Sequence, residues 1–402
     1  MRWLPRTLEI TLARHAREFP VVVLTGPRQS GKTTLLRRAF PRADYVSFEP
    51  LDVRSVASSD PRGLLASLRR PLILDEVQHA PALLSYVQEE VDAHRRSKGR
   101  FFVTGSQNLL LMERASQTLA GRASVQTLLS LSLREQTGAA NEAPPWETSV
   151  RRPAARVHDG LWRHLVRGGH PELVVAPRRD AESWLSSYRR TYVERDVRTL
   201  RQVGDLLQFD LFLRALAARS ANLLDLSDVS RDLGVAVNTV KAWLSVLEAS
   251  WIVAVVRPWS GNLGTRLVKT PKVYFLDTGL LCHLCGYGDA AQAASGPAAG
   301  AIFETAVFGE LYRHAAHRGR PPRIHFFRTA TGHEVDFLVE HEGGLVPVEA
   351  KATATPVPGH AAGILRLRER LGDVVRPGFV VHAGERRGPL AVGVEALPLG
   401  SL

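Results

Sequence analysis

The stretch GPRQSGKT, Gly26–Thr33, decides the fold. It follows the apolar run Val21–Leu24 directly and opens a segment, residues 34–38, that is typical of a helix start. A strand, a glycine-containing loop and a helix N-terminus form the setting in which the pattern G-x-x-x-x-G-K-[ST] binds phosphate. The glycines let successive backbone N–H groups point at phosphate oxygens, and the helix N-terminus adds partial positive charge. We therefore expect a nucleoside triphosphate to bind at this P-loop.

The positions of this loop have separate expected roles. Lys32 is expected to reach the β- and γ-phosphates, and the Thr33 hydroxyl to ligate Mg²⁺. The residues expected to contact ATP are Gly26, Pro27, Arg28, Gln29, Ser30, Gly31, Lys32, Thr33 and Thr34. ATP and Mg²⁺ are thus the expected cofactors.

A second apolar run, Pro71–Leu74, ends in the acidic pair Asp75-Glu76. An acidic pair after a buried strand fits a Walker B element, in which Asp75 supports Mg²⁺ and Glu76 orients and deprotonates the attacking water. This pair is the feature that favours hydrolysis over simple nucleotide binding. The alternative is a pair of strand-end carboxylates in a loop.

A third apolar run, Phe101–Val103, ends in Thr104-Gly105-Ser106. A polar side chain here would lie between the two Walker strands and could contact the γ-phosphate or the attacking water. Either Thr104 or Ser106 fits this position, and the sequence does not choose between them. The alternative is that these hydroxyls cap the next helix.

These motifs extend along the chain as GPRQSGKT, LILDEVQHAP, FFVTGSQNLL, LAGR, GGHPE, YVERDV, VYFLDTGLL and EVDFLV…VEAKA. Together they resemble the prokaryotic AAA+ ATPases that carry a C-terminal domain of unknown function, and the resemblance covers essentially the whole chain. It implies an ATPase domain, a winged-helix middle and a C-terminal domain with a restriction-endonuclease-like fold. It also implies that Arg122 of LAGR is an arginine finger that completes the site of a neighbouring subunit in a homo-oligomer. The alternative is that Arg122 is a solvated arginine on a basic protein.

The predicted fold class is α/β, with a P-loop parallel sheet, a helical and winged-helix middle and an α/β PD-(D/E)XK-like end. Strands are predicted at 21–25, around 45–48, and at 71–75, 101–105 and 125–131. The predicted domains are the ATPase domain at 1–140, a helical linker or lid at 141–220, a winged helix-turn-helix at 221–285, a flexible linker at 286–300 and the C-terminal domain at 301–402.

The last predicted domain contains an acidic cluster. Asp336 lies on one predicted strand of a hairpin, and Glu349 and Lys351 lie two residues apart on the next. With Glu304 from the preceding helix, these side chains could bind a metal and activate water, as the D…ExK pattern of PD-(D/E)XK nucleases implies. The alternatives are nucleic-acid binding without cleavage, or salt bridges in an inactive remnant of the fold.

Net charge of +12 with a pI near 10.2 favours a polyanionic partner, most plausibly DNA. The helix at 238–248 offers Asn238, Thr239, Lys241 and Ser245 to a DNA groove, and Arg257, Arg266, Lys269 and Lys272 would contact phosphates from the wing. The alternative for the charge is Arg spread over many solvated faces, and the alternative for the winged helix is a protein–protein module or a lid.

Other features limit the class of protein. The two cysteines, Cys282 and Cys285, are too few for a disulfide framework and supply at most half a zinc site. No apolar stretch is long enough to span a membrane, and we expect a cytoplasmic protein without a membrane partner. The leading hypothesis is an ATP-driven machine or switch that acts on DNA. The alternatives are an ATP-gated signalling or defence switch and a metal-dependent nuclease that uses ATP as a cofactor.

Overall fold

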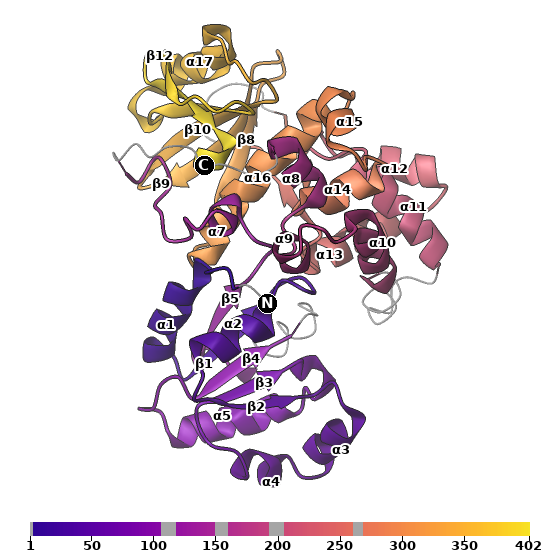
Figure 1. Ribbon diagram of the computed structural model, residues 1–402, viewed down its shortest axis with the longest axis vertical. Helices are drawn as coiled ribbons and strands as arrows, with labels where there is room; N and C mark the ends of the chain where they lie inside the picture. Colours follow the sequence, from indigo (N-terminus) through magenta and orange to yellow (C-terminus); the bar gives the residue numbers. More distant parts are fainter. Residues whose placement is uncertain (1–2, 106–117, 149–159, 193–204, 260–267) are drawn as a thin grey trace.

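The computed structural model describes residues 3–105, 118–148, 160–192, 205–259 and 268–402. Figure 1 shows an N-terminal sheet domain at the bottom, a helical middle region at the right and a second sheet domain at the top left. The long helix α16 (Ala299–His317) runs between the two sheet domains. Ser106, one of the two residues predicted to contact the γ-phosphate or the attacking water, lies outside the described residues.

The N-terminal sheet is parallel, with strand order β2–β3–β4–β1–β5. Its strands are β1 (Val21–Thr25), β2 (Asp44–Ser47), β3 (Leu72–Asp75), β4 (Phe101–Thr104) and β5 (Ala123–Thr127). The predicted strands are confirmed in place and order of appearance, although the last begins and ends earlier than expected. Because parallel strands end at one edge of the sheet, the P-loop and the acidic pair after β3 lie near each other.

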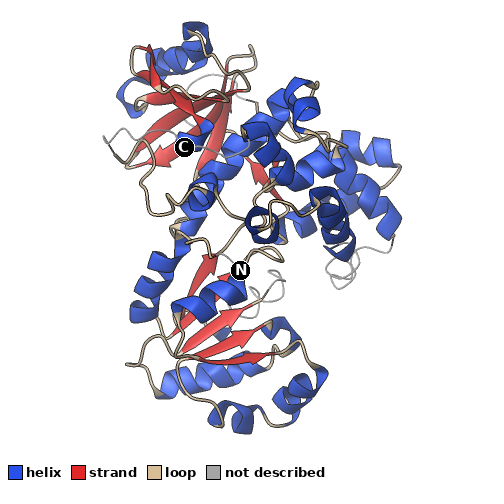
Figure 2. Ribbon diagram, in the orientation of Figure 1, coloured by secondary structure: helices blue, strands red, loops and turns tan. Residues whose placement is uncertain are grey.

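Helices cover both faces of this sheet, as Figure 2 shows. They are α1 (Leu8–Glu18), α2 (Lys32–Ala39), α3 (Leu51–Ser59), α4 (Pro61–Ala66) and α5 (Leu83–Ala93), with a 3₁₀ turn η1 (Val77–His79). Val22 and Leu24 pack with residues of α1 and α2, whereas Val21 and Val23 pack with residues of α5. Alternate residues of β1 therefore enter two separate cores, which explains its unbroken apolar sequence.

The middle region is mainly helical. Its helices are α7 (Leu133–Gln136), α8 (Leu161–Arg167), α9 (Pro171–Val175), α10 (Ala181–Tyr192), α11 (Leu206–Ala217), α12 (Leu226–Leu233), α13 (Val237–Ala249), α14 (Thr278–Leu284) and α15 (Ala290–Ser295). Gly234, in a left-handed conformation with φ 66°, ends α12, and α13 follows after a short turn. Strands β6 (Val253–Val256) and β7 (Lys272–Phe275) then pair antiparallel, while the winged-helix assignment stays a prediction.

Residues 286–300, for which the sequence predicts a flexible linker, contain α15 and the start of α16. The side chain of Asp289 accepts hydrogen bonds from the backbone N–H groups of Ala291 and Gln292 and so caps α15. Ala293 is fully buried. The alanine-rich composition suggested flexibility, but alanine is also the strongest helix former. With Asp289 capping its first turn, the segment forms a helix.

A six-stranded mixed sheet forms the C-terminal domain, in the order β12–β13–β11–β10–β9–β8. The elements after α16 are β8 (Ile324–Arg328), β9 (Glu334–His341), β10 (Gly344–Lys351), α17 (Ala362–Leu371), β11 (Gly378–His382), β12 (Gly388–Ala391) and β13 (Val394–Pro398). The predicted hairpin is confirmed, since β9 and β10 pair antiparallel with Val348 opposite Phe337.

The middle region and the C-terminal domain share one hydrophobic core. It extends from Leu165 on α8 through Trp243 on α13 and Phe303 on α16 to Leu397 on β13. A core that spans these elements fixes the C-terminal sheet against the middle helices.

Candidate nucleotide site

The P-loop wraps around the side chain of its own lysine. Lys32 is buried, and its Nζ donates hydrogen bonds to the carbonyl oxygens of Gly26 at 3.0 Å and Pro27 at 2.8 Å. Gly26 has φ 139°, and a Cβ placed on it would lie 2.0 Å from the carbonyl oxygen of Leu128. Gly31, with φ 92°, precedes the first helical residue of α2. These two glycines therefore permit the turn that aims the backbone N–H groups at a phosphate.

Asp75 lies at the end of β3 beside the start of α2. The Thr33 hydroxyl donates to the Asp75 carboxylate, at 3.1 Å from Oδ1 and 3.0 Å from Oδ2. The Tyr45 hydroxyl donates to Asp75 Oδ2 at 2.8 Å. Burial raises the pKa of Asp75, and the hydrogen bond from Tyr45 opposes that rise. Tyr45 is a contact that the sequence analysis did not find.

This hydroxyl and carboxylate are the oxygen ligands that Mg²⁺ prefers, directly or through water, so the residues present fit a magnesium ion. Lys32 can exchange its two backbone acceptors for phosphate oxygens without leaving the loop. The structure thus brings together the P-loop, Thr33 and Asp75 as the sequence predicts, and their roles toward ATP and Mg²⁺ stay predictions.

Glu76 follows Asp75 in a left-handed conformation, with φ 55°. This conformation is uncommon for a residue with a side chain and costs on the order of 1 kcal/mol. The side chain of Gln78 donates a hydrogen bond to Glu76 Oε2. Thr104, the other residue predicted at this position, is fully buried at the end of β4 and lies near enough to Asp75 to favour the charged form of that carboxylate. The edge of the sheet therefore presents Asp75, Glu76 and Thr104 together.

Arg122 lies just before β5, at the end of the sheet opposite the P-loop. Its guanidinium pairs with the Asp92 carboxylate of α5 at 2.8 and 2.9 Å and donates to the carbonyl oxygen of Ala120. The structure does not bring Arg122 to the nucleotide site of its own chain. Its predicted role toward a neighbouring subunit stays a prediction.

A cavity of about 830 Å³ opens between the P-loop and the helices α9 and α10. The predicted residues on its wall are Arg28, Gln29, Gly31, Lys32, Thr33, Thr34 and Glu76. The facing wall includes Arg179, which pairs with Glu172 Oε1 at 2.8 Å, and Trp184, whose indole N–H donates to Glu172 Oε2 at 2.9 Å. None of the residues of this wall was predicted to contact nucleotide, although the glycines and proline of GGHPE mark where the wall begins.

A second cavity of about 750 Å³ adjoins the first across the P-loop and shares Gln29, Gly31, Thr33, Thr34 and Glu172 with it. Its apolar lining comes from Trp3, Leu4, Leu131, Pro171 and Val175. An apolar wall next to a phosphate-binding loop suits the base of a nucleotide. The guanidinium of Arg38 lies over the Trp3 ring, 4.7 Å from its centroid.

The C-terminal acidic residues have different short-range partners but interact with one another, since burial and the nearby Asp336 together raise the pKa of Glu304 to about 7. Ala350 N–H donates to Asp336 Oδ2 at 2.8 Å, and Lys351 Nζ lies 3.0 Å from Glu349 Oε2 and 3.8 Å from Asp336 Oδ2. Glu304 instead accepts from Lys272 at 2.9 Å and Tyr274 at 2.6 Å. Burial raises the pKa of Glu349 well above its ordinary value, and the nearby Asp336 adds to the rise.

Within the described residues, no three His, Cys, Asp or Glu side chains are arranged to hold a metal ion. Asp336 and Glu349 are both largely buried, and the Lys351 ammonium lies within ion-pair distance of both carboxylates. Two carboxylates beside a lysine are the arrangement that the D…ExK pattern describes, and the predicted roles of these residues toward a metal stay predictions.

One predicted phosphate contact is wrong. Lys272 is 3% exposed, and its Nζ pairs with Glu304 at 2.9 Å and Glu334 at 2.7 Å, because β7 packs against α16 and the start of β9. Arg266 lies outside the described residues, while Arg257 and Lys269 are exposed. Asn238, Lys241 and Ser245 share the exposed face of α13. Within the parts of the chain that the structure describes, no helix has the length and apolar character needed to cross a membrane.

Comparison with known proteins identifies relatives of the whole chain. Family models match an AAA domain at residues 18–137, a domain of unknown function (DUF8612) at 158–291 and another (DUF4143) at 299–402. Uncharacterized proteins of Mycobacterium tuberculosis and Mycobacterium bovis are each 32% identical over 395 residues, covering 96% of this chain and 82% of the relative. The chain belongs to this family of AAA-domain proteins. It is an AAA-family ATPase by its AAA domain.

Two solved structures are also similar to this AAA-domain protein. A Walker-type ATPase of Pyrococcus abyssi has a TM-score of 0.43 and 15% identity, covering 69% of this chain and 94% of its own. The RuvB Holliday junction branch migration motor of Thermotoga maritima has a TM-score of 0.31 and 18% identity, covering 62% of this chain and 89% of its own. Similarities this distant do not extend to target or assembly.

Proposed function

We propose that this AAA-family ATPase hydrolyses Mg-ATP at the P-loop and uses the nucleotide cycle to act on DNA. The observation that carries the first part is one cavity that contains Lys32, Thr33 and Glu76, with Asp75 next to Thr33. The far wall of the cavity belongs to α9 and α10. Nucleotide would thus touch two parts of the chain, whose relative position it can change.

Each residue has a task in this proposal. Lys32 and the loop N–H groups bind the β- and γ-phosphates, and Glu76 accepts a proton from the attacking water. Bound Mg²⁺ supplies charge neutralisation at the β- and γ-oxygens, and Thr33 and Asp75 would hold it. Arg179, on the opposite wall, is a candidate to approach the γ-phosphate from the middle region. Arg122 would complete the site of a second copy of the chain.

A binding experiment tests the nucleotide site. Lys32→Ala should weaken ATP binding on the order of 30-fold, since a hydrogen-bonded charge contributes about 2 kcal/mol. Displacement of a fluorescent ATP analogue gives the affinity. Exposed Arg42→Ala on the same domain is the control, expected to bind like the wild type. Equal ATP affinity in Lys32→Ala and the wild type would show that ATP binds elsewhere.

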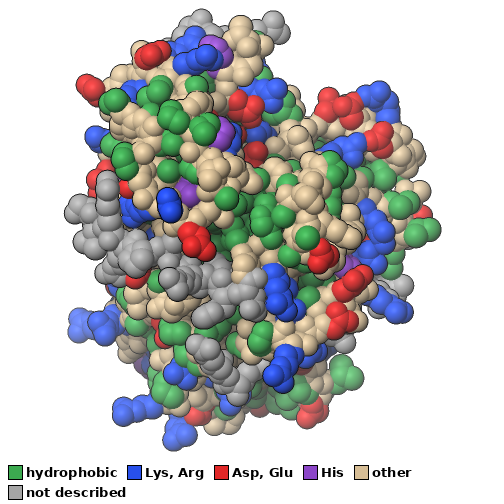
Figure 3. Space-filling view, turned by 45° about the horizontal axis from the view of Figure 1, so that its top comes forward, with side chains coloured by type: hydrophobic (Ala, Val, Ile, Leu, Met, Phe, Trp, Pro, Cys, Tyr) green, Lys and Arg blue, Asp and Glu red, His purple; other side chains and the backbone are tan. Residues whose placement is uncertain are grey.

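The DNA part of the proposal rests on charge and on one helix face. Net charge is +12, and the exposed face of α13 carries Asn238, Lys241 and Ser245. Basic and acidic side chains are interspersed on the face seen in Figure 3, so charge there is not of a single sign. DNA should stimulate ATP turnover in the wild type and less so in Lys241→Ala. No DNA binding at low salt, where phosphate contacts are strongest, would eliminate this part.

A second function, an ATP-gated switch without a DNA target, is favoured by the position of the β6–β7 connection. Trp259 N–H donates to the carbonyl oxygen of Phe326 on β8, and Val268 N–H donates to that of Arg328. A hairpin attached to the C-terminal sheet can transmit movement to it. Slow ATP turnover, no response to DNA and a nucleotide-dependent oligomer size in light scattering would support the switch over the DNA machine.

A further inference from the structure

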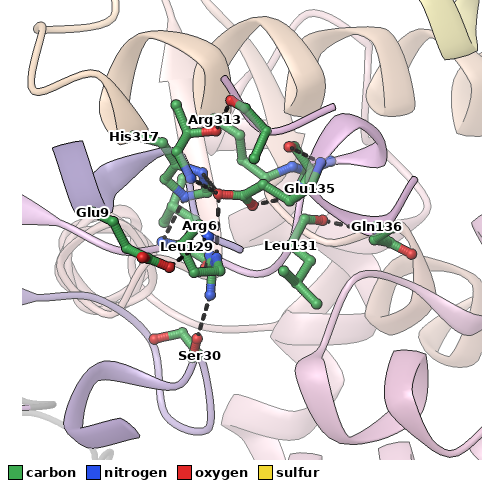
Figure 4. A network of polar contacts seen from close by, with 12 residues as sticks. Arg6, Glu9, Ser30, Leu129, Leu131, Glu135, Gln136, Arg313 and His317 are labelled. Carbon is green, nitrogen blue, oxygen red and sulfur yellow. Dashed lines mark hydrogen bonds and ion pairs between the residues drawn. The ribbon is translucent and has the colours of Figure 1, made fainter. Parts of the chain in front are cut away.

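Behind the P-loop lies a buried row of charged side chains, shown in Figure 4. Arg6 Nη1 donates to the carbonyl oxygen of Ser30, in the P-loop, at 2.9 Å, and Nη2 donates to that of Leu129 at 2.7 Å. Arg6 Nε lies 3.2 Å from Glu135 Oε1. Arg6 and Glu135 are 4% and 0% exposed. The guanidinium thus fixes one P-loop carbonyl relative to the end of β5.

Glu135 connects this guanidinium to the C-terminal part of the chain. Its Oε1 accepts from Thr7 N–H at 2.9 Å and lies 3.1 Å from Nδ1 of His317, the last residue of α16. Its Oε2 accepts from Ser132 N–H at 2.9 Å. Four groups therefore surround one buried carboxylate, and the charge of Arg6 holds its pKa far below the ordinary value.

The tautomer of His317 follows from its neighbours. Leu129 N–H donates to His317 Nε2 at 3.1 Å, so Nε2 has no proton, and the proton on Nδ1 faces Glu135. Burial lowers the pKa of His317, and the adjacent Glu135 carboxylate opposes that shift. His317 is thus a neutral bridge, with one donor and one acceptor, between α16 and the segment that follows β5.

The same helix makes a second contact with this segment. Leu133 N–H donates to Glu310 Oε2 at 3.1 Å, and Arg313 donates to Glu310 Oε1 and to the carbonyl oxygen of Leu276, both at 2.7 Å. Toward its other end, α16 carries Glu304, which pairs with Lys272. One continuous helix therefore links the P-loop support to the acidic group of the C-terminal domain.

Stability alone is a weak reason for such a row, since buried ion pairs can often be replaced by apolar residues at no net loss. What the row does supply is a defined position for Ser30. We infer that Arg6, Glu135 and His317 position the P-loop. The C-terminal domain then supports the ATP site from a distance, through His317 at the end of α16. The inference rests on the proposed binding of ATP at the P-loop. By linkage, ATP then stabilises the contact of α16 with the ATPase domain.

Conservative variants of the full chain test this role. In Arg6→Lys a single ammonium replaces the guanidinium that donates to the carbonyl oxygens of both Ser30 and Leu129. In His317→Gln the acceptor of the hydrogen bond from Leu129 N–H is moved away. Arg6→Lys should weaken ATP binding on the order of tenfold, as expected for a lost hydrogen bond from a charged group, and His317→Gln roughly fivefold, as expected for a lost neutral one. The affinities come from displacement of a fluorescent ATP analogue, on protein whose folding is verified by circular dichroism.

Arg134→Ala is the matched control. Arg134 also lies on α7, but it donates hydrogen bonds to the carbonyl oxygens of Leu402 at 3.0 Å, Ser401 at 2.9 Å and Ala143 at 2.9 Å. It should lower the unfolding temperature and leave ATP affinity within about twofold of the wild type. If Arg6→Lys and His317→Gln also stay within that range, the positioning role is wrong.

A measurement on the wild type does not depend on how variants fold. Saturating ATP with Mg²⁺ should slow amide hydrogen exchange in residues 310–317 as well as in 26–34. Protection of 26–34 without any change in 310–317 would overturn the inference and leave the ATP site intact. No ATP binding at all would instead overturn the proposed function.

Discussion

The hydroxyl of Tyr45 offers a sharp test of the magnesium site, because Tyr45→Phe removes one oxygen atom and little else. In the structure this hydroxyl donates to Asp75 Oδ2 at 2.8 Å, and Asp75 is 5% exposed. A hydrogen bond to a charged group contributes about 1.5–3 kcal/mol. Tyr45 is itself 37% exposed, which reduces the expected loss to about 1 kcal/mol, or roughly fivefold in an equilibrium constant.

The assay is ATP turnover at fixed ATP and varied Mg²⁺. Without the donor, the Asp75 carboxylate loses one of the hydrogen bonds that fix its orientation beside Thr33, so it is less well placed to support the cation. Tyr45→Phe should need roughly fivefold more Mg²⁺ for half-maximal turnover, with the maximal rate within about twofold. Tyr86→Phe, whose ring lies near Arg62, is the control. An unchanged Mg²⁺ requirement in Tyr45→Phe would refute the assignment of Asp75 as a metal-supporting residue.

Three further predictions concern the walls and supports of the site. Arg179→Ala should lower maximal ATP turnover on the order of tenfold while ATP affinity changes less, as measured by steady-state kinetics. The control is Arg178→Ala, and equal maximal turnover in the two variants would contradict a role for Arg179. Gly169→Ala should lower the free energy of unfolding by about 1–3 kcal/mol in urea, because its Cβ would lie 2.5 Å from the carbonyl oxygen of Leu131. The lowered pKa of His317 gives stability that is present above pH 6.5 and lost as pH falls, since only the unfolded chain takes up the proton. Below pH 6.5 the free energy of unfolding of His317→Gln should fall less steeply with pH than that of the wild type, by up to about 1.4 kcal/mol per pH unit. Equal slopes of unfolding free energy against pH in the two proteins would contradict this.

The parts of the site that the sequence predicts are those built from neighbouring residues. The P-loop lies between β1 and α2, and the acidic pair follows β3, because glycine positions and apolar runs are local signals. The hairpin of β9 and β10 was predicted for the same reason, from alternation around a Gly-Gly turn. Local sequence patterns were therefore sufficient to predict the P-loop, the acidic pair and the sheet that positions them.

What the sequence did not reveal depends on contacts between distant parts of the chain. Leu129 and His317 are 188 residues apart, yet they share a hydrogen bond behind the P-loop. Lys272 had the charge of a phosphate contact, but its partner Glu304 lies 32 residues further on, and no local pattern announces that pair. A charged residue in a sequence shows neither its burial nor its partner, so its role could not be predicted.

The central claim is that Glu76 activates water for ATP bound at the P-loop. Single-turnover hydrolysis of radiolabelled ATP by the wild type and Glu76→Gln, with bound ATP quantified in the same samples, tests it most directly. We predict equal ATP binding and a rate reduced by about 10²–10⁴-fold in Glu76→Gln, the range for loss of a general base. Hydrolysis by Glu76→Gln at the wild-type rate, with ATP equally bound, would contradict the claim.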